Sequence, residues 1–339
     1  MNAVAGLTKS RFAPSGPLIA VAAVVALIGL AIATGGPVIV RQVVSGLLLG
    51  AIYMTVAVAF TLTIGVLNFL NFTIPSLFML TGMVAWASVS RGYLTFAGTW
   101  AWLVGLFIGV SVAVAASLLV ERFTFRYLKM RHGDATEHAI PLVSSLGFLL
   151  IFENLILIPL GSESQRFAIP FKADIQIAGL VIGVAQLASC ALAVAVVAAL
   201  SFILKRTKIG RALRTIAENP DTASLLGVEV SRVVPVVFIL TGLLSGVAGA
   251  LFTVNYGDVS PFMGDNVGTK AIAAMVLGGI GSIWGAIAGG LVVGLAETLS
   301  IQYFGGDSVA VTVWGLVLVI IILRPKGLFG IASIGKGKM

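Results

Sequence analysis

The sequence predicts an all-α integral membrane protein, and its composition leads to this prediction. Of its 339 residues, 59% are hydrophobic and only 10% are charged, whereas soluble domains carry roughly 25% charged residues. The mean hydropathy is +1.10. The 40 glycines fit this class, because small residues let membrane helices approach closely.

Long apolar segments define the predicted helices, because without water in the hydrocarbon core such segments satisfy their backbone groups as helices. The segments lie at about 18–34, 43–65, 72–90, 98–120, 139–160, 177–204, 233–254, 270–300 and 308–323. The first segment follows Lys9 and Arg11, as in a signal peptide. Its length suits a membrane span, and we expect it to be retained as a helix.

The basic residues cluster in loops and predict the orientation of the helices. Residues 121–131, residues 205–214 and the tail after 323 are rich in Lys and Arg, as cytoplasmic loops are. The loop at 161–175 mixes both signs and the loop at 255–269 carries no Lys or Arg, and both are predicted to be periplasmic. The net charge of +8 therefore reflects membrane topology, and no nucleic-acid partner is expected.

The segment 270–300 must begin and end on the same side of the membrane if the basic tail is cytoplasmic. Its motif LGGIGSIWGAIAGG is rich in glycine, which weakens a helix interior. We expect a glycine-rich re-entrant hairpin beside about eight full transmembrane helices, or about ten helices if the hairpin crosses the membrane. Both termini are then cytoplasmic, and residues 1–339 form a single membrane domain.

Small residues inside this segment suggest a packing surface. Gly281, Gly285 and Gly289 recur at intervals of four, and Gly290 and Gly294 continue the spacing nearby. On a helix this spacing gives a smooth face for close contact. The face packs within the chain, or part of it meets a second transmembrane subunit.

The stretch KRTKIGRALRTIAENPDTASLLGVEVSR at 205–232 predicts two short helices outside the membrane. Ile209, Leu213 and Ile216 form the apolar side of the first helix, and Glu218 lies on its polar side. Such a helix is too short to span the membrane, so it is expected to lie along the surface.

A cap separates these two helices. Asn219 is the predicted N-cap of the second helix, with Pro220 at its first position and Gly227 at its end. One interpretation is a basic loop that fixes topology and touches anionic lipid head groups. The other is a coupling loop (205–231) that docks on a cytoplasmic partner.

No catalytic motif stands out, and the chain is not expected to be an enzyme. The tail GIASIGKG nearly matches the phosphate-binding G-x-x-x-x-G-K-[ST] loop, but Gly337 replaces the required hydroxyl residue. Any energy from ATP must therefore come from another chain. The lone Cys190 excludes a disulfide scaffold and a cysteine-ligated metal site, and no cofactor or metal is expected.

Several stretches carry a resemblance to a known family. They are SGLLLGAIYMTVAVAFTLTIGVLNFLNF, RTKIGRALRTIAENPDTASLLGVEV, GVAGALFTVNYGDVSPFMG, KAIAAMVLGGIGSIWGAIAGGLVVGLAETLS and LRPKGLFG. Over residues 40–330 the chain resembles the permease subunits of branched-chain amino acid ABC importers. The subunit that lacks a long extension is the most similar.

The resemblance implies an assembly in a bacterial inner membrane. Two related permease subunits, as a heterodimer or as two copies, form the pathway, and two cytoplasmic ATPase subunits drive transport. A periplasmic solute-binding protein delivers branched-chain amino acids or related small carboxylated or polar solutes. The ATPase-coupling residues that the resemblance implies are Thr207, Gly210, Arg211, Ala212, Arg214, Ala223 and Gly227. Glu218, on the polar side of the first short helix, is added to them.

The chain departs from the family at one place. After the pair Asn71 and Phe72, the family usually has Ala-His-Gly followed by an acid, and this chain has Thr73, Ile74, Pro75 and Ser76. Isoleucine thus replaces the histidine and serine replaces the acid. Because both ionisable groups are absent, the solute stays open.

The polar stretch NFLNFTIPS at 68–76 is the candidate substrate pathway, because polar groups in membrane helices usually face the bundle or a water-filled cavity. Pro75 removes a backbone donor and can unwind a helix, and transporter sites are often built from interrupted helices. The candidates are Asn68, Asn71, Thr73, Pro75 and Ser76. Alternatively, Asn68 and Asn71 tie helices together by hydrogen bonds.

Two acids lie within apolar segments, Glu153 and Glu297. We expect Glu297 to lie near a membrane surface and to be solvated. Glu153 is predicted to be deeper and is a candidate for the pathway, for an interhelical contact or for a proton relay. A proton-coupled secondary transporter that uses Glu153 is therefore the alternative to an ABC importer.

Overall fold

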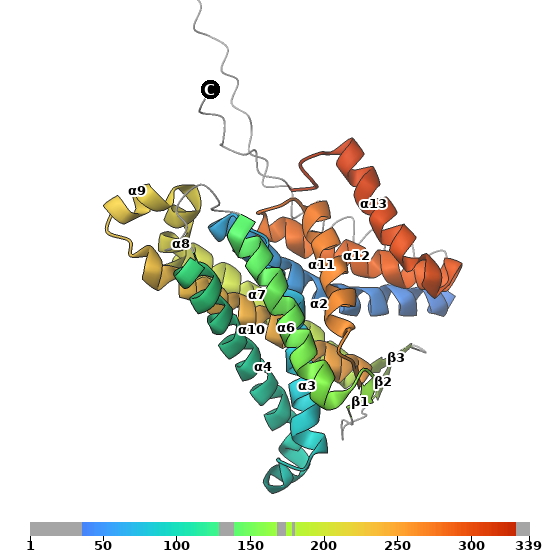
Figure 1. Cartoon of the computed structure of the whole chain (residues 1–339). Coiled ribbons are helices and arrows are strands. Elements are labelled where there is room, and N and C mark those ends of the chain that lie inside the picture. The colour runs from blue at the N-terminus through green and yellow to red at the C-terminus, as the bar shows by residue number, and fades with distance from the viewer. Residues whose placement is uncertain (1–35, 129–138, 168–173, 178–179, 330–339) are drawn as a thin grey trace, which may run out of the picture.

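The computed structural model describes residues 36–128, 139–167, 174–177 and 180–329, which fold into a bundle of helices (Figure 1). The long helices are α2 (Gly36–Leu67), α3 (Thr73–Ser90), α4 (Ala101–Val120), α6 (Ala139–Leu160), α7 (Val184–Arg206), α10 (Val230–Tyr256), α11 (Met263–Gly278), α12 (Ile283–Phe304) and α13 (Val309–Leu323). The short ones are η1 (Thr95–Trp100), η2 (Glu121–Leu128), α8 (Lys208–Glu218), α9 (Pro220–Leu225) and η4 (Gly306–Ser308).

Two small antiparallel strand pairs complete the described chain. Strand β1 (Gln165–Arg166) pairs with β4 (Asp258–Val259), which follows α10. Strands β2 (Asp174–Ile177) and β3 (Leu180–Gly183) form a hairpin before α7. Their small extent leaves the helices to determine the architecture.

The described residues include 8 helices long and apolar enough to cross a membrane. This finding confirms the prediction of an all-α integral membrane protein. The predicted helix at 18–34 and both termini lie outside the described residues.

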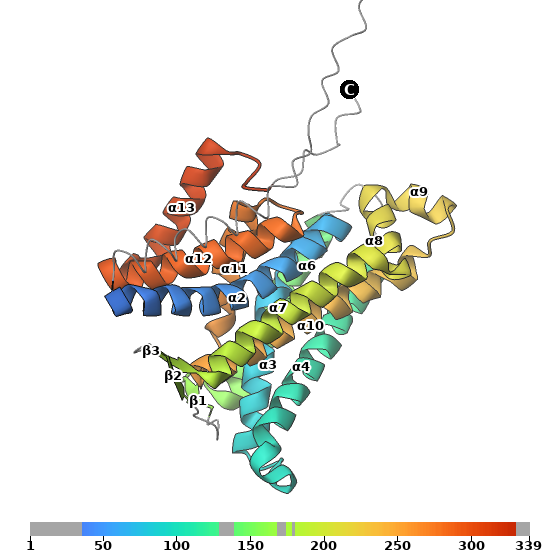
Figure 2. The same cartoon turned by 180° about the vertical axis from the view of Figure 1, so that it is seen from behind.

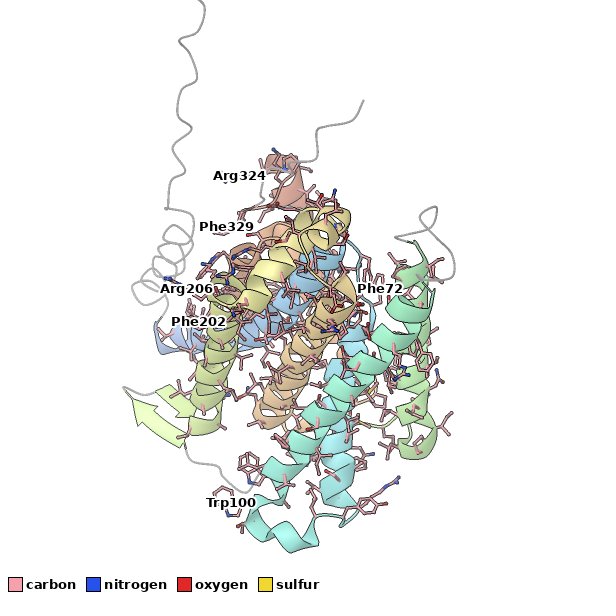
Figure 3. All side chains as sticks on the ribbon, turned by 90° about the vertical axis from the view of Figure 1, so that its left-hand side faces the viewer. Phe72, Trp100, Phe202, Arg206, Arg324 and Phe329 are labelled. Atoms are coloured by element: carbon pink, nitrogen blue, oxygen red, sulfur yellow. The ribbon has the colours of Figure 1, made fainter. Side chains whose placement is uncertain are left out.

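One end of the bundle gathers the basic loops and is called here the basic end. Arg206, at the end of α7, and Arg324, after α13, both lie there, opposite Trp100 (Figure 3). The turn between α11 and α12 is at the same end, because Lys205 Nζ lies 5.0 Å from the ring centroid of Trp284 at the start of α12. By the positive-inside rule, this end is expected to be cytoplasmic.

The predicted hairpin at 270–300 is a pair of antiparallel helices, α11 and α12, that meets at the basic end. Gly279 and Gly281 adopt positive φ angles of 108° and 84°, which end α11 and turn the chain before Ile283. Gly281 therefore lies in the turn rather than on a helical face. The 16 residues of α11 make it about 24 Å long, less than the roughly 30 Å of the hydrocarbon core.

Helix α2 is the centre of the bundle, and its neighbours pack closely against it. Of its membrane-spanning window, 78% is buried, compared with 11% for α13 at the periphery. Helices α2 and α12 lie side by side (Figure 2). A Cβ added at Gly50 of α2 would lie 2.8 Å from Leu291 Cα, so only glycine permits this approach.

The glycines of α12 serve two different neighbours within the chain. A Cβ at Gly285 or Gly289 would overlap the backbone of α11, and one at Gly290 or Gly294 would overlap the backbone of α2. Close contact of this kind gives van der Waals attraction where lipid supplies no hydrophobic force between helices. In the described structure, intrachain packing therefore occupies these four glycines.

A buried polar network joins three helices midway along their length. Lys270 Nζ of α11 lies 2.5 Å from Glu297 Oε1 of α12, and the hydroxyl of Tyr53 on α2 donates to Glu297 Oε2 at 2.6 Å. Glu297 is only 7% exposed, so the expectation that its side chain is solvated is wrong. Burial is tolerated because each carboxylate oxygen has a charged or hydrogen-bonding partner.

The α2–α12 contact gives a stability prediction with an internal control. Gly294→Ala places a methyl group into the backbone of Gly50 and should cost about 1–3 kcal/mol. A Cβ added at Gly315 of α13 would meet no atom within 4 Å. The substitution Gly315→Ala should therefore be neutral or stabilising by up to about 1 kcal/mol. The unfolding midpoint of the detergent-purified chain measures both changes, and equal midpoints for the two variants would contradict the packing argument.

Candidate functional site

The candidate pathway stretch at 68–76 is the turn between α2 and α3. Helix α2 ends at Leu67, Asn68 takes a left-handed conformation with φ of 56°, and α3 begins at Thr73. Gly65, in the last turn of α2, lies beside Gly281, which places the turn toward the basic end. The stretch therefore separates two helices instead of interrupting one.

Asn71 holds the first turn of α3 in place. Its Oδ1 accepts hydrogen bonds from the backbone N–H of Thr73 at 3.0 Å and from the Thr73 hydroxyl at 2.7 Å. Its Nδ2 is buried and has no hydrogen-bond partner in the described part of the chain. The bond to another helix comes from the next residue, because the Phe72 N–H donates to Ser145 Oγ of α6 at 3.2 Å.

Pro75 starts α3 rather than breaking it. It is the third residue of the helix, within the first turn, where backbone N–H groups have no intrahelical acceptor. Its ring packs on α11, since a Cβ added at Gly268 would lie 2.8 Å from Pro75 Cβ. The carbonyl of Ile74, one residue earlier, accepts a hydrogen bond from Ser245 Oγ of α10 at 2.6 Å.

Most of the predicted pathway residues are covered in this conformation. Asn71, Thr73 and Ser76 are at most 1% exposed, and Pro75 is buried against α11. Asn68 alone of the five candidates is exposed. Their role in the pathway stays a prediction. Helix α11 covers Pro75, since Gly264 and Gly268 pack against it.

Helix α11 carries a polar surface that the sequence did not reveal. Its exposed side chains are Asp265, Asn266 and Thr269, and the half-buried Lys270 borders them. These four residues, called here the α11 polar face, lie on the side of the helix turned away from Gly264 and Gly268, the two glycines that contact Pro75. The large exposed side chains on α4, α7 and α13 are apolar, as expected for lipid contact, except for Lys205 and Arg206 in the last turn of α7.

Glu153 joins the α11 polar face from another helix. Its carboxyl group, half-buried on α6, lies close enough to that of Asp265 for the two groups to interact electrostatically. The structure thus connects one predicted site residue with a residue from the predicted periplasmic loop 255–269. The single glycines Gly264 and Gly268, four positions apart and each followed by polar residues, were the sequence signal for this helix.

The start of α8 is fixed tightly to the end of α7. Thr207 caps α8, because its Oγ1 accepts a hydrogen bond from the Gly210 N–H at 3.1 Å. A Cβ at Gly210 would lie 2.6 Å from the carbonyl carbon of Leu204, so only glycine fits. The Arg214 guanidinium donates to the Leu204 carbonyl oxygen at 2.9 Å, which also places a positive charge at the C-terminal end of α7.

The predicted pair of short helices is present as α8 and α9. Leu213 and Ile216 are at most 2% exposed, whereas Ile209, predicted on the same apolar side, is 45% exposed. Asn219 Oδ1 accepts from the Thr222 N–H at 3.1 Å and caps α9. Gly227, with φ of 83°, follows α9.

The remaining coupling candidates fall into two groups. Ala223 is fully buried and Ala212 is half-buried, so they help to pack the pair of helices. Arg211 and Glu218 are exposed on α8. Exposed apolar side chains at the end of α9, Leu225 at 87% and Leu226 at 71%, were not singled out from the sequence.

Comparisons with known proteins identify the family of the chain. A family model described as "Branched-chain amino acid transport system / permease component" matches residues 42–323. The high-affinity branched-chain amino acid transport system permease protein BraD of Pseudomonas aeruginosa is 30% identical over 311 residues, which cover 87% of this chain and 97% of BraD. The corresponding permease protein LivH of Escherichia coli K12 is 28% identical over 303 residues, with the same coverage of 87% and 97%.

A shorter match reaches a permease with another solute in its name. The fructose import permease protein FrcC of Rhizobium meliloti is 35% identical over 120 residues, covering 34% of this chain and 33% of FrcC. The matches to the family model and to BraD extend over most of the chain. They show that the chain belongs to the family of permease components of branched-chain amino acid transport systems.

Proposed function

We propose that the chain is the permease subunit of a binding-protein-dependent ABC importer in a bacterial inner membrane. Its solutes are branched-chain amino acids or related small carboxylated or polar molecules. The names of BraD and LivH, which align with nearly the whole chain, support this solute class. The local match to FrcC shows why family membership alone does not decide the solute.

The observation that carries the proposal is the rigid attachment of α8 to the bundle. Thr207, Gly210 and Arg214 join α8 to the end of α7, and α8 also contacts α2 and α10. A force applied to α8 is therefore transmitted to helices that cross the membrane. A loop that served only topology would need no such attachment.

The proposed assembly supplies what the chain lacks. Two cytoplasmic ATPase subunits bind α8 and α9, a second permease subunit completes the pathway, and a periplasmic solute-binding protein delivers the solute. The α11 polar face supports a second subunit or a water-filled pathway, because polar side chains at membrane depth are costly in lipid.

Transport follows alternating access in this proposal. Closure of the ATPase pair moves α8 and α9, and this movement rocks α7, α2 and α10 as a unit. Helix α11 packs on Pro75 and is tied to α2 and α12 through Lys270 and Glu297. It therefore moves with them and opens its polar face to one side of the membrane at a time.

Disruption of the α8–α9 surface tests ATPase docking. Arg211→Glu reverses an exposed charge, and Gly227→Val forces a β-branched residue into a left-handed conformation that costs about 1–2 kcal/mol. The double variant should lose at least about tenfold in ATPase copurification, equivalent to about 1.4 kcal/mol of binding, and should lose uptake.

Arg324→Glu is the matched control for this experiment. Arg324 is also exposed at the basic end but lies outside α8 and α9, so its reversal should leave copurification intact. Unchanged ATPase copurification in the double variant would count against the docking role.

A proton-coupled secondary transporter is the second candidate, and the proximity of Glu153 and Asp265 favours it. Two neighbouring carboxyl groups repel each other when both are ionised, so a proton or another cation beside them is favoured. Glu153→Gln replaces one of these carboxyl groups with an uncharged amide of nearly the same shape.

The Glu153→Gln variant separates the two candidates. In an ATP-driven importer, saturating solute should still stimulate the ATPases of the reconstituted variant at least half as well as in the wild type, and an ionophore that collapses the proton gradient should leave wild-type uptake unchanged. Wild-type uptake that stops with the ionophore, and is lost in Glu153→Gln, would instead establish proton coupling.

A further inference from the structure

The α11 polar face carries one charge of each sign. Asp265 and Lys270 are five positions apart, a rise of about 7.5 Å along the helix, and Asn266 and Thr269 lie between them. Asp265, Asn266 and Thr269 are exposed, and the Lys270 side chain is 23% exposed. The face therefore presents an anion, a cation and two hydrogen-bonding groups to whatever lies outside the chain.

The negative part of this face is not neutralised by the described chain. Glu153 adds a second carboxyl group beside Asp265, and the ion pairs among the described residues join other partners, Glu229 with Arg232 and Lys270 with Glu297. Two neighbouring carboxyl groups attract a cation. A cation from outside the described chain would complete this part of the face.

The positive part is held in a fixed position. Glu297 contacts Lys270 Nζ from α12, and the Tyr53 hydroxyl orients Glu297 from α2. The ammonium group therefore has one side paired inside the bundle and keeps further donors, because an ammonium carries three. A small carboxylate at the exposed side of Lys270 would find a pre-oriented donor.

We propose that the α11 polar face, together with Glu153, binds the zwitterionic head group of an α-amino acid. The ammonium group of the solute lies between the carboxylates of Asp265 and Glu153. Its carboxylate lies toward Lys270, with hydrogen bonds from Asn266 and from Thr269, whose hydroxyl gives up its bond to the Asp265 carbonyl when the solute binds. This assignment rests on the proposed function and narrows its solute class, because an uncharged sugar or a simple carboxylic acid satisfies only part of the face.

Equilibrium binding of radiolabelled leucine to the purified permease complex, with its second permease subunit and ATPases and without the solute-binding protein, tests the assignment. Unlabelled leucine should compete at least about tenfold better than 4-methylpentanoate, which lacks the ammonium group, or 3-methylbutylamine, which lacks the carboxylate. Such a ratio corresponds to about 1.4 kcal/mol. Fructose should not compete.

Variants locate the site on α11. Asp265→Asn should raise the dissociation constant for leucine about tenfold or more, and Thr269→Val should raise it less, by about threefold. Asp307→Asn is the matched control, because Asp307 is an exposed carboxylate in η4, outside α11, and it should leave leucine binding unchanged.

The outcomes separate this assignment from the proposed function. The assignment is overturned if 4-methylpentanoate competes as well as leucine, or if Asp265→Asn and Thr269→Val both leave the dissociation constant for leucine unchanged. ATP-driven uptake by the wild-type complex would still support the importer in either case. The assignment is also overturned if the wild-type complex binds no leucine and the Asp265→Asn complex loses its second permease subunit. The cation that pairs with Asp265 would then come from that subunit and not from the solute. Absence of ATP-driven uptake in the wild-type complex refutes both.

Discussion

The hydrocarbon core contains no water, so a polar group there must be paired within the protein or must face an aqueous space. This constraint separates the polar residues of the chain into two sets. Lys270, Glu297 and Tyr53 satisfy one another in the interior. The Oδ1 of Asn71 accepts bonds from the first turn of α3, whereas its Nδ2 has no partner in the described part of the chain. Asp265, Asn266 and Thr269 are exposed on α11. The second set, together with the partly exposed Lys270 beside it, is where we expect solute or a second subunit.

The same environment explains why the bundle is held by small residues. Lipid tails are as apolar as leucine, so helices gain little by hiding leucine from lipid and gain more by close backbone contact. The contacts of Gly50 and Gly294 between α2 and α12 provide this. Helices α11 and α12 use Gly278 and Gly285 in the same way. A tightly packed centre that carries the pre-oriented polar network can move as a unit when α8 is displaced.

Much of the fold could be predicted from the sequence, because its strongest signals are local. The lengths of the apolar segments predicted the spanning helices, and Asn219 with Pro220 predicted the break between α8 and α9. Predictions from local sequence failed for side chains whose interaction partner is distant in the sequence. Glu297 was expected to be solvated because the predicted topology put it near a membrane surface, and nothing local pointed to its partner Lys270, 27 residues away. The start of α11 was assigned to a loop, because Asp265 and Asn266 lower the hydropathy there.

The central claim is that this chain forms a pathway but does not power it. The most direct measurement is solute accumulation in vesicles at equal permease density, with the chain alone or with its second permease subunit, ATPases, binding protein and ATP. The account predicts accumulation against a gradient only in the complete set, and its loss when ATP is withheld. Accumulation by the chain alone would contradict it.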